Sequence, residues 1–66
     1  MYENGQTLTD DEHFHDHLEH GIPIQVYHQT EHRDIGYIEE YTDHFIKMNS
    51  ILYNRNLHKF ISRPGY

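Results

Sequence analysis

The stretch from Gly36 to Ile46 constrains the fold of this chain more than any other segment. Its pattern is that of two strands joined by a turn that carries Asp43, because runs of strand-forming residues flank residues typical of turns. Other short strand-like segments lie before and after it. One helix followed by five strands is the order that emerges, and it predicts a mainly β fold. We expect a small, strongly bent antiparallel β-barrel of the SH3-like kind.

The size of the chain limits it to one domain with a small core. A chain of 66 residues buries little apolar surface and usually needs disulfides, a metal or other subunits for stability. The absence of cysteine excludes disulfides, leaves metal binding or oligomerisation, and agrees with a reducing, cytoplasmic location. We expect residues 1–8 to form a flexible leader and residues 9–66 to form the barrel domain.

A helix is predicted from about residue 10 to 20. The segment Thr9-Asp10-Asp11-Glu12 matches a capping box, in which the threonine and the glutamate satisfy free amides of the first turn. Gly21 is placed to end the helix. Phe14 and Leu18 lie four residues apart and share a face, so we expect this narrow apolar stripe to pack on the sheet.

The hydrophobic period changes to two from Ile22, which predicts that the strands occupy about residues 22–64. Ile22, Ile24 and Val26 alternate with residues of the opposite face. The polar segment from Thr30 to Asp34 predicts a turn, and Gly36 permits a sharp bend in the strand after it. Further strands are expected at 35–41, 44–48, 51–54 and 58–62.

The net charge of -6 argues against strong nonspecific attraction to a polyanion. The charges are unevenly distributed, because six carboxylates and no lysine or arginine lie in residues 1–20, whereas all basic residues lie from Arg33 onward. The longest apolar runs are two or three residues, so we expect no membrane span.

Three short motifs resemble the bacterial Hfq family of Sm-like proteins. The first two motifs match strands of that family, and the third matches the turn that follows: Ile22-Pro23-Ile24-Gln25-Val26-Tyr27, Gly36-Tyr37-Ile38-Glu39-Glu40-Tyr41 and Asp43-His44-Phe45. The resemblance implies a homo-oligomeric ring, joined by edge strands, that binds single-stranded uridine- or adenine-rich RNA. Two departures stand out: Leu57-His58-Lys59 replaces a Tyr-Lys-His signature, and the basic helix end of the family is absent.

The resemblance also implies which residues contact RNA. Phe45 corresponds to an aromatic residue that stacks on a base at the pore, and His58 and Lys59 correspond to donors toward the nucleotide. Tyr27 matches an aromatic residue on the other face of the ring. The alternative is structural, with Phe45 in the core and Tyr27 as a half-buried strand tyrosine.

His13, His17 and His20 follow the spacing i, i+4 and i+7, which places three imidazoles on one face of the predicted helix. This spacing suits zinc, nickel or copper. No His-Glu-x-x-His motif is present, so a hydrolytic zinc site is not predicted. The alternatives are a solvated polar face or adventitious binding of zinc or nickel. Eight histidines also allow a pH response.

No catalytic set emerges from the sequence. There is no cysteine, no glycine elbow around Ser50 or Ser62, and no glycine-rich phosphate loop. Glu39 and Glu40 are neighbours in a strand and therefore point to opposite faces. We expect a binding protein without a cofactor. Its partner is single-stranded RNA or, alternatively, a protein, because six tyrosines suit a protein interface equally well.

Overall fold

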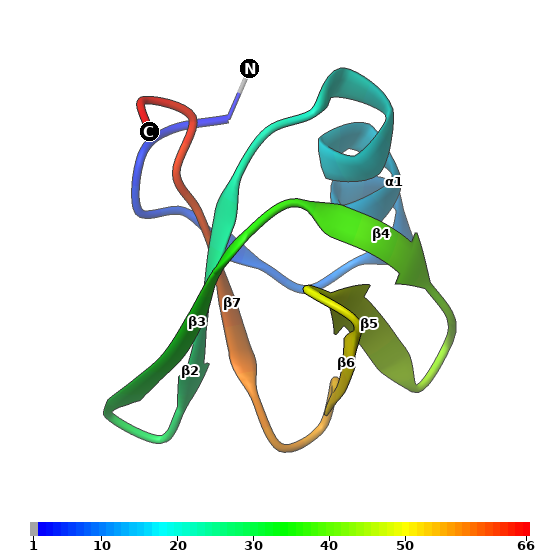
Figure 1. Cartoon of the computed structure of the whole chain (residues 1–66). Helices are drawn as coiled ribbons and strands as arrows, with labels where there is room; N and C mark the ends of the chain where they lie inside the picture. The colour runs from blue at the N-terminus through cyan, green and yellow to red at the C-terminus, as the bar shows by residue number, and fades with distance from the viewer. Residues whose placement is uncertain (1) are drawn as a thin grey trace.

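The computed structural model describes residues 2–66, which form one helix and seven strands arranged in two antiparallel sheets (Figure 1). The strand order is β1-β7-β2-β3 in the first sheet and β4-β5-β6 in the second. The mainly β fold with one short helix is confirmed, but the two sheets remain separate and no closed barrel is found within these residues. The elements are β1 (Thr7–Leu8), α1 (Asp11–His20), β2 (Ile24–His28), β3 (Glu31–Gly36), β4 (Ile38–Tyr41), β5 (Phe45–Met48), β6 (Ile51–Asn54) and β7 (Lys59–Ser62).

The strand expected at 35–41 is divided between the two sheets. β3 ends at Gly36 and β4 begins at Ile38, so the chain passes from one sheet to the other within one residue. A Cβ atom on Gly36 would lie 3.1 Å from the Asn49 side-chain nitrogen, so the missing side chain lets the β5–β6 turn approach. The bend predicted at this glycine is therefore present, and it changes the sheet.

The turn expected at residues 30–34 is wrong for all but Thr30, because residues 31–34 belong to β3. The β2–β3 hairpin turns at Gln29 and Thr30, and Gln29 has a φ of 58°. Most of β3 is exposed to solvent. A strand that faces water carries polar residues, and this polarity resembles the composition of a turn.

The helix has the predicted length but a different start and buried face. Asp10 occupies the capping position, and the Nδ1 atom of His13 accepts backbone N–H groups from Thr9 at 3.1 Å and Asp10 at 3.3 Å. Gly21 ends the helix with a φ of 62°, as predicted. The apolar stripe was predicted to include Leu18, which is 36% exposed; the buried residues of the helix are Phe14 and His17.

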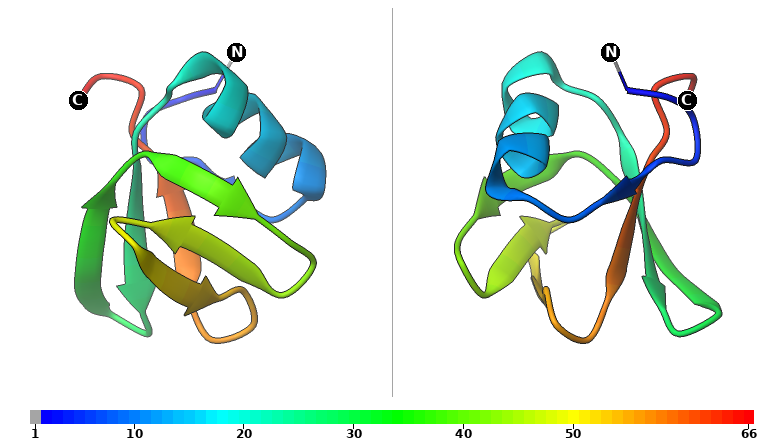
Figure 2. Two further views of the ribbon diagram at one scale, coloured as in Figure 1. Left: turned by 45° about the vertical axis from the view of Figure 1, so that its right-hand side comes forward. Right: turned by 180° about the vertical axis from the view of Figure 1, so that it is seen from behind.

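The core fills the space between the two sheets and the helix. Phe14 of α1 meets Phe60 of β7 edge to face, with ring centroids 5.5 Å apart. Figure 2 shows the helix lying across one end of the two sheets. The buried apolar side chains are Leu8, Phe14, Ile24, Val26, Ile38, Ile46, Met48, Tyr53, Phe60 and Ile61.

The boundary expected between a leader and the domain at residue 9 is wrong. Thr7 and Leu8 form β1, which pairs with Ile61 and Phe60 of β7, and Leu8 is 3% exposed. Two residues are too few to show a hydrophobic period, so the sequence pattern did not reveal this strand. Because β2 pairs with the other edge of β7, both edges of β7 are occupied within the chain.

Asp34 links the two sheets through its carboxylate. It accepts hydrogen bonds from the Tyr53 hydroxyl at 2.7 Å, the Asn49 amide at 2.9 Å and the Ile35 backbone N–H at 2.8 Å. Burial alone would raise the pKa of Asp34, but these hydrogen bonds outweigh it and hold the pKa below its ordinary value. Burial and the bond to Asp34 raise the pKa of Tyr53 to about 12.

Candidate nucleic-acid interface

Tyr27 and Lys59 lie side by side on the outer face of the four-stranded sheet. They are direct partners in the ladder between β2 and β7. Residues directly opposite each other in a ladder project to the same face. The pair on the opposite face, Val26 and Phe60, is buried in the core. The structure therefore brings together two of the four residues predicted to contact RNA on one surface, where Lys59 is exposed and Tyr27 is half-buried, as the structural alternative for Tyr27 expected.

His32 and Arg63 extend this surface on either side. His32 lies opposite Tyr27 in β3, and the two rings meet edge to face with centroids 5.3 Å apart. Arg63 follows β7 and donates hydrogen bonds to the side-chain oxygens of Gln25 and Asn4. These neutral acceptors orient the guanidinium and leave its charge uncompensated. We call the surface formed by Tyr27, His32, Lys59 and Arg63 the β2–β7 face.

A shallow hollow of about 390 Å³ lies in the β2–β7 face and has no acidic residue in its lining. This lining reflects the distribution of charge along the chain, because all eleven carboxylates precede residue 44 and four of the five lysines and arginines follow it. The hollow is therefore locally cationic in a chain whose net charge is negative. Its lining residues are Gly5, Tyr27, Gln29, Thr30, Lys59, Ile61 and Arg63.

Lys59 is exposed and available to a ligand, whereas two arginines outside this face have acidic partners. Arg33 lies 3.0 Å from the Glu31 carboxylate, and Arg55 lies 2.6 Å from that of Asp11. Within residues 2–66, neither lysine forms an ion pair with a carboxylate. Lys59 therefore carries one of the few free positive charges of the chain, next to an aromatic ring.

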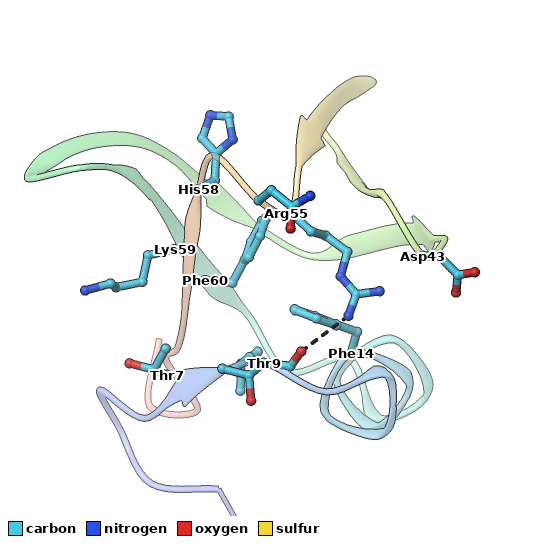
Figure 3. Close-up of a pocket in the computed structure, with 10 residues that line it drawn as sticks. Thr7, Thr9, Phe14, Asp43, Arg55, His58, Lys59 and Phe60 are labelled. Atoms are coloured by element: carbon cyan, nitrogen blue, oxygen red, sulfur yellow. Dashed lines mark hydrogen bonds between the residues drawn. The ribbon is translucent and has the colours of Figure 1, made fainter.

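Arg55 has a structural role that the sequence pattern did not reveal. Its guanidinium donates to the backbone oxygens of Thr42 at 2.7 Å and Thr9 at 3.3 Å, and it lies over the Phe14 ring, 4.6 Å from the centroid. Figure 3 shows this group pointing into a cleft of about 400 Å³, toward Thr9 and Phe14. Because its donors are used within the chain, Arg55 joins the helix start to the β4–β5 loop.

His58 and Lys59 do not point toward a common ligand position. Both line the cleft of Figure 3, but their side chains extend in different directions from the chain. The His58 ring lies 5.2 Å from the Tyr53 ring and 5.5 Å from the His28 ring, measured between centroids. Its Nδ1 atom lies 2.9 Å from the Asn54 carbonyl oxygen, so it donates to that oxygen. The predicted pairing of these two donors is therefore not formed in the chain.

Phe45 lies on the other sheet, away from the β2–β7 face. It pairs with Asn54 across the β5–β6 ladder and is 37% exposed. The hollow beside it, of about 470 Å³, is lined by other residues of the three-stranded sheet, including Lys47 and Leu52. Phe45 is therefore neither a buried core residue nor a neighbour of Tyr27, Lys59 or His58.

The three-histidine metal site expected on the helix is not assembled. His17 points into the core and is 1% exposed, with Nδ1 2.7 Å from the His13 carbonyl oxygen and Nε2 2.7 Å from the Ser62 hydroxyl. The Nδ1 atom of His13 caps the helix start, and His20 is exposed. Within residues 2–66, no three His, Cys, Asp or Glu side chains are grouped so as to hold a metal ion.

His17 and Ser62 have the spacing of a base and a nucleophile, but both are buried. Ser62 is 0% exposed, so no substrate reaches its hydroxyl. Burial lowers the pKa of His17, although the bond to the His13 carbonyl partly opposes this effect. The Tyr2 ring packs on His17, with centroids 4.3 Å apart. A hydrogen bond to Asp16 and burial raise the pKa of Tyr2 to about 12. The hydrogen bond between His17 and Ser62 therefore joins the helix to β7.

Comparison with protein-family models, curated proteins and solved structures yields no match to this chain. The candidate interface therefore rests on the geometry and charge of the residues themselves. No helix within residues 2–66 is long and apolar enough to cross a membrane. The nucleic-acid contacts implied by the short motifs remain predictions, and the β2–β7 face is where the structure groups residues suited to them.

Proposed function

We propose that this protein is a non-catalytic binding protein and that the β2–β7 face contacts single-stranded RNA. The observation that carries the proposal is the direct pairing of Tyr27 with Lys59 beside a hollow that has no acidic lining. An aromatic ring next to free cations is the combination that single-stranded nucleic acids require, because bases stack on the ring and phosphates approach the cations.

Three residues of the face contact the RNA in this proposal. Tyr27 stacks on an unpaired base, a contact worth about 1–3 kcal/mol that depends little on the identity of the base. Lys59 and Arg63 attract the flanking phosphates, and the hydrogen bond to Gln25 holds the arginine in place. With two cations engaged, the affinity depends mainly on stacking.

The proposed contact does not require the ring implied by the Sm-like resemblance. A ring joined by edge strands could use β7 only if one of its edges were free, and β1 and β2 occupy both edges. A ring through β7 would form only after β1 leaves it and exposes Leu8, which is buried. We therefore assign RNA binding to the single chain, through a face that remains open while β1 is in place.

Tyr27→Ala and Phe45→Ala form a matched pair that tests the proposal. Both remove an aromatic ring from a strand, but the rings lie on different sheets. Fluorescence anisotropy with labelled uridine- and adenine-rich single strands should show Tyr27→Ala weakening binding about 5- to 150-fold, the equivalent of one stacked base. Phe45→Ala should leave the affinity unchanged. Equal losses in both variants, or no binding by the unaltered chain at low salt, would contradict the proposal.

The salt dependence separates stacking from phosphate contact. For single strands the logarithm of the affinity falls with the logarithm of salt concentration by about 0.7 per phosphate contacted. Two cations on the face predict a shallow slope of about -1.4. Lys59→Gln should reduce this slope by about half, whereas Lys47→Gln on the other sheet should not change it. A slope that Lys59→Gln does not alter would exclude Lys59 from the contact.

A further inference from the structure

β6 is an edge strand whose backbone is open on one side. It pairs with β5 alone, and the next strand, β7, belongs to the other sheet. The β5–β6 turn has two residues, Asn49 and Ser50, with φ values of 50° and 65°. In the ladder that follows such a turn, alternate residues direct their N–H and C=O groups away from the partner strand. Leu52 is at such a position, so its backbone groups are free to pair with another chain.

The edge lacks the features that protect most edge strands from pairing. β6 has the sequence Ile-Leu-Tyr-Asn, without charge, proline or register shift. Ile51 is 49% exposed and Leu52 is 61% exposed, and Leu57 in the turn after β6 is also 61% exposed. Three large aliphatic side chains beside a free backbone edge are typical of a surface that binds protein.

A cleft of about 510 Å³ separates this edge from the β2–β3 hairpin. Ile51, Leu52, Tyr53 and Leu57 line it on the β6 side, and none of its lining residues is acidic. The remaining residues of its lining are His28, Arg33 and His58. The guanidinium of Arg33 has one exposed partner, the Glu31 carboxylate, so it has donors left for a second carboxylate. The cleft is thus apolar along one side and presents the remaining donors of Arg33 at the other.

We propose that this cleft binds an extended protein segment that alternates apolar and acidic residues. The segment adds to the sheet as a strand next to β6 and forms backbone hydrogen bonds with Leu52. Its apolar side chains contact Leu52 and Leu57. A carboxylate from the segment reaches Arg33. Apolar and charged contacts lie on opposite sides of an added strand, because successive side chains of a strand alternate in direction.

The chemistry of the cleft favours such a peptide over RNA and over a second copy of the chain. The exposed side chains of its β6 side, Ile51, Leu52 and Leu57, are aliphatic and offer a base neither a flat aromatic surface nor a hydrogen bond. The rings in its lining are buried or half-buried: Tyr53, His28 and His58. Two copies paired through β6 would place uncharged strands together and would leave Arg33 without an acidic partner on the edge, since β6 contains no carboxylate. An acidic and apolar segment satisfies both sides of the cleft.

A phage library of random ten-residue peptides, selected on the intact protein, tests the proposal. The expected result is enrichment of peptides that alternate aliphatic residues with Asp or Glu. Isothermal titration with a selected peptide should then show that Leu52→Lys and Arg33→Glu each weaken binding about tenfold or more, as loss of a central interface contact does. Leu18→Lys is the matched control, because Leu18 is an exposed leucine on the helix and should leave the affinity unchanged.

A charge exchange makes the test sharper. Arg33→Glu should bind a version of the selected peptide in which Lys replaces the acidic residues, and the unaltered chain should not. Tyr27→Ala should bind the peptide normally, so failure of RNA binding and failure of peptide binding are distinguishable. No enriched pattern, or equal affinity of all variants, would overturn the proposal. Sedimentation that shows a dimer lost in Leu52→Lys would assign the edge to a second copy instead.

Discussion

The two sheets of this protein offer their surroundings different kinds of surface. In the four-stranded sheet β7 and β2 are paired on both edges, so the surface that we propose for RNA is a face of side chains that includes Tyr27 and Lys59. The three-stranded sheet ends in β6, so the surface that we propose for a peptide is a backbone edge beside Leu52. The difference shows how strand pairing decides which groups remain for binding. Only side chains remain on a strand that is paired on both edges, whereas backbone N–H and C=O groups also remain on a strand with one open edge.

The sheets also differ in how they are held to the rest of the molecule. The four-stranded sheet contacts the helix through the Phe14–Phe60 ring pair and through the hydrogen bond between His17 and Ser62. The three-stranded sheet is joined to it by the bend after Gly36 and by the polar contacts of Asp34. Apolar packing also holds the three-stranded sheet, because Ile38, Ile46 and Met48 are buried in the same core and β4 lies against the helix. The Asp34 carboxylate adds a polar link between the two sheets.

The largest expected effect comes from the apolar contact of the four-stranded sheet. Phe60→Ala should lower the free energy of unfolding by about 3–5 kcal/mol, because it removes a buried ring and leaves a cavity next to Phe14. Urea denaturation followed by circular dichroism measures this loss. Phe45→Ala on the other sheet is the matched control and should change stability far less, since that ring is 37% exposed. Similar losses in the two variants would show that the sheets are equally packed.

The next largest effect tests the junction between the sheets. Asp34→Ala should lower the free energy of unfolding by about 1–3 kcal/mol, because the Tyr53 hydroxyl and the Asn49 amide lose their acceptor. Asp43→Ala removes an exposed carboxylate from a loop and should leave stability within about 0.5 kcal/mol of the unaltered chain. Urea denaturation of both variants measures the difference between their stabilities. Equal stability of the two variants would mean that the hydrogen bonds of Asp34 add nothing to the junction.

The elements predicted correctly from the sequence are those with local physical signals. Gly21 ends the helix in the left-handed conformation, where a glycine carries no steric penalty. Ile24 and Val26 are both buried and alternate with the half-buried Gln25 and Tyr27. Asn49 and Ser50 form a tight turn, with positive φ values, between the strands predicted at 44–48 and 51–54. Each of these features depends on a few consecutive residues, so the sequence alone contains the information.

The features that were missed depend on contacts between distant residues. Leu8 belongs to the core because β7, more than fifty positions later, pairs with it. His17 is buried because Ser62 supplies a hydrogen-bond partner, although histidine on a polar helix suggests exposure. Among the residues predicted to contact RNA, Tyr27 and Lys59 are adjacent, whereas Phe45 and His58 lie elsewhere; Arg63, beside the adjacent pair, was not predicted. Spacing along the chain carries no signal for such pairs.

The pH dependence of stability tests the polar contact between the helix and the four-stranded sheet. Burial lowers the folded-state pKa of His17 below its ordinary value of 6.5, so the folded protein favours the neutral ring. The unfolded chain binds a proton more readily, and His17 therefore contributes its full stability above pH 6.5. That contribution is lost as the pH falls from 6.5 toward the folded-state pKa. The groups around the ring are Tyr2, His13, Asp16 and Ser62.

Urea denaturation at pH values between about 7.5 and 5, the range in which histidine ordinarily titrates, should show this loss of stability. The variant His17→Gln removes the titrating ring and should flatten the pH dependence, whatever its stability at neutral pH. His20→Ala, which removes an exposed histidine of the same helix, should keep the slope of the unaltered chain. If His17→Gln keeps the slope and His20→Ala loses it, the pH response belongs to the helix surface.

The smallest expected effect on stability concerns the open edge of the three-stranded sheet. Leu52→Lys should change the free energy of unfolding by no more than about 0.5 kcal/mol, because the side chain is 61% exposed and packs on no core residue that the fold requires. The same substitution should weaken binding of the selected peptide. Leu52 would then matter for binding and not for folding, whereas Phe60 matters for folding. This contrast distinguishes the open edge from the packed core. If Leu52→Lys instead unfolds the protein as readily as Phe60→Ala, then β6 is part of the core and its exposed leucine is not a docking position.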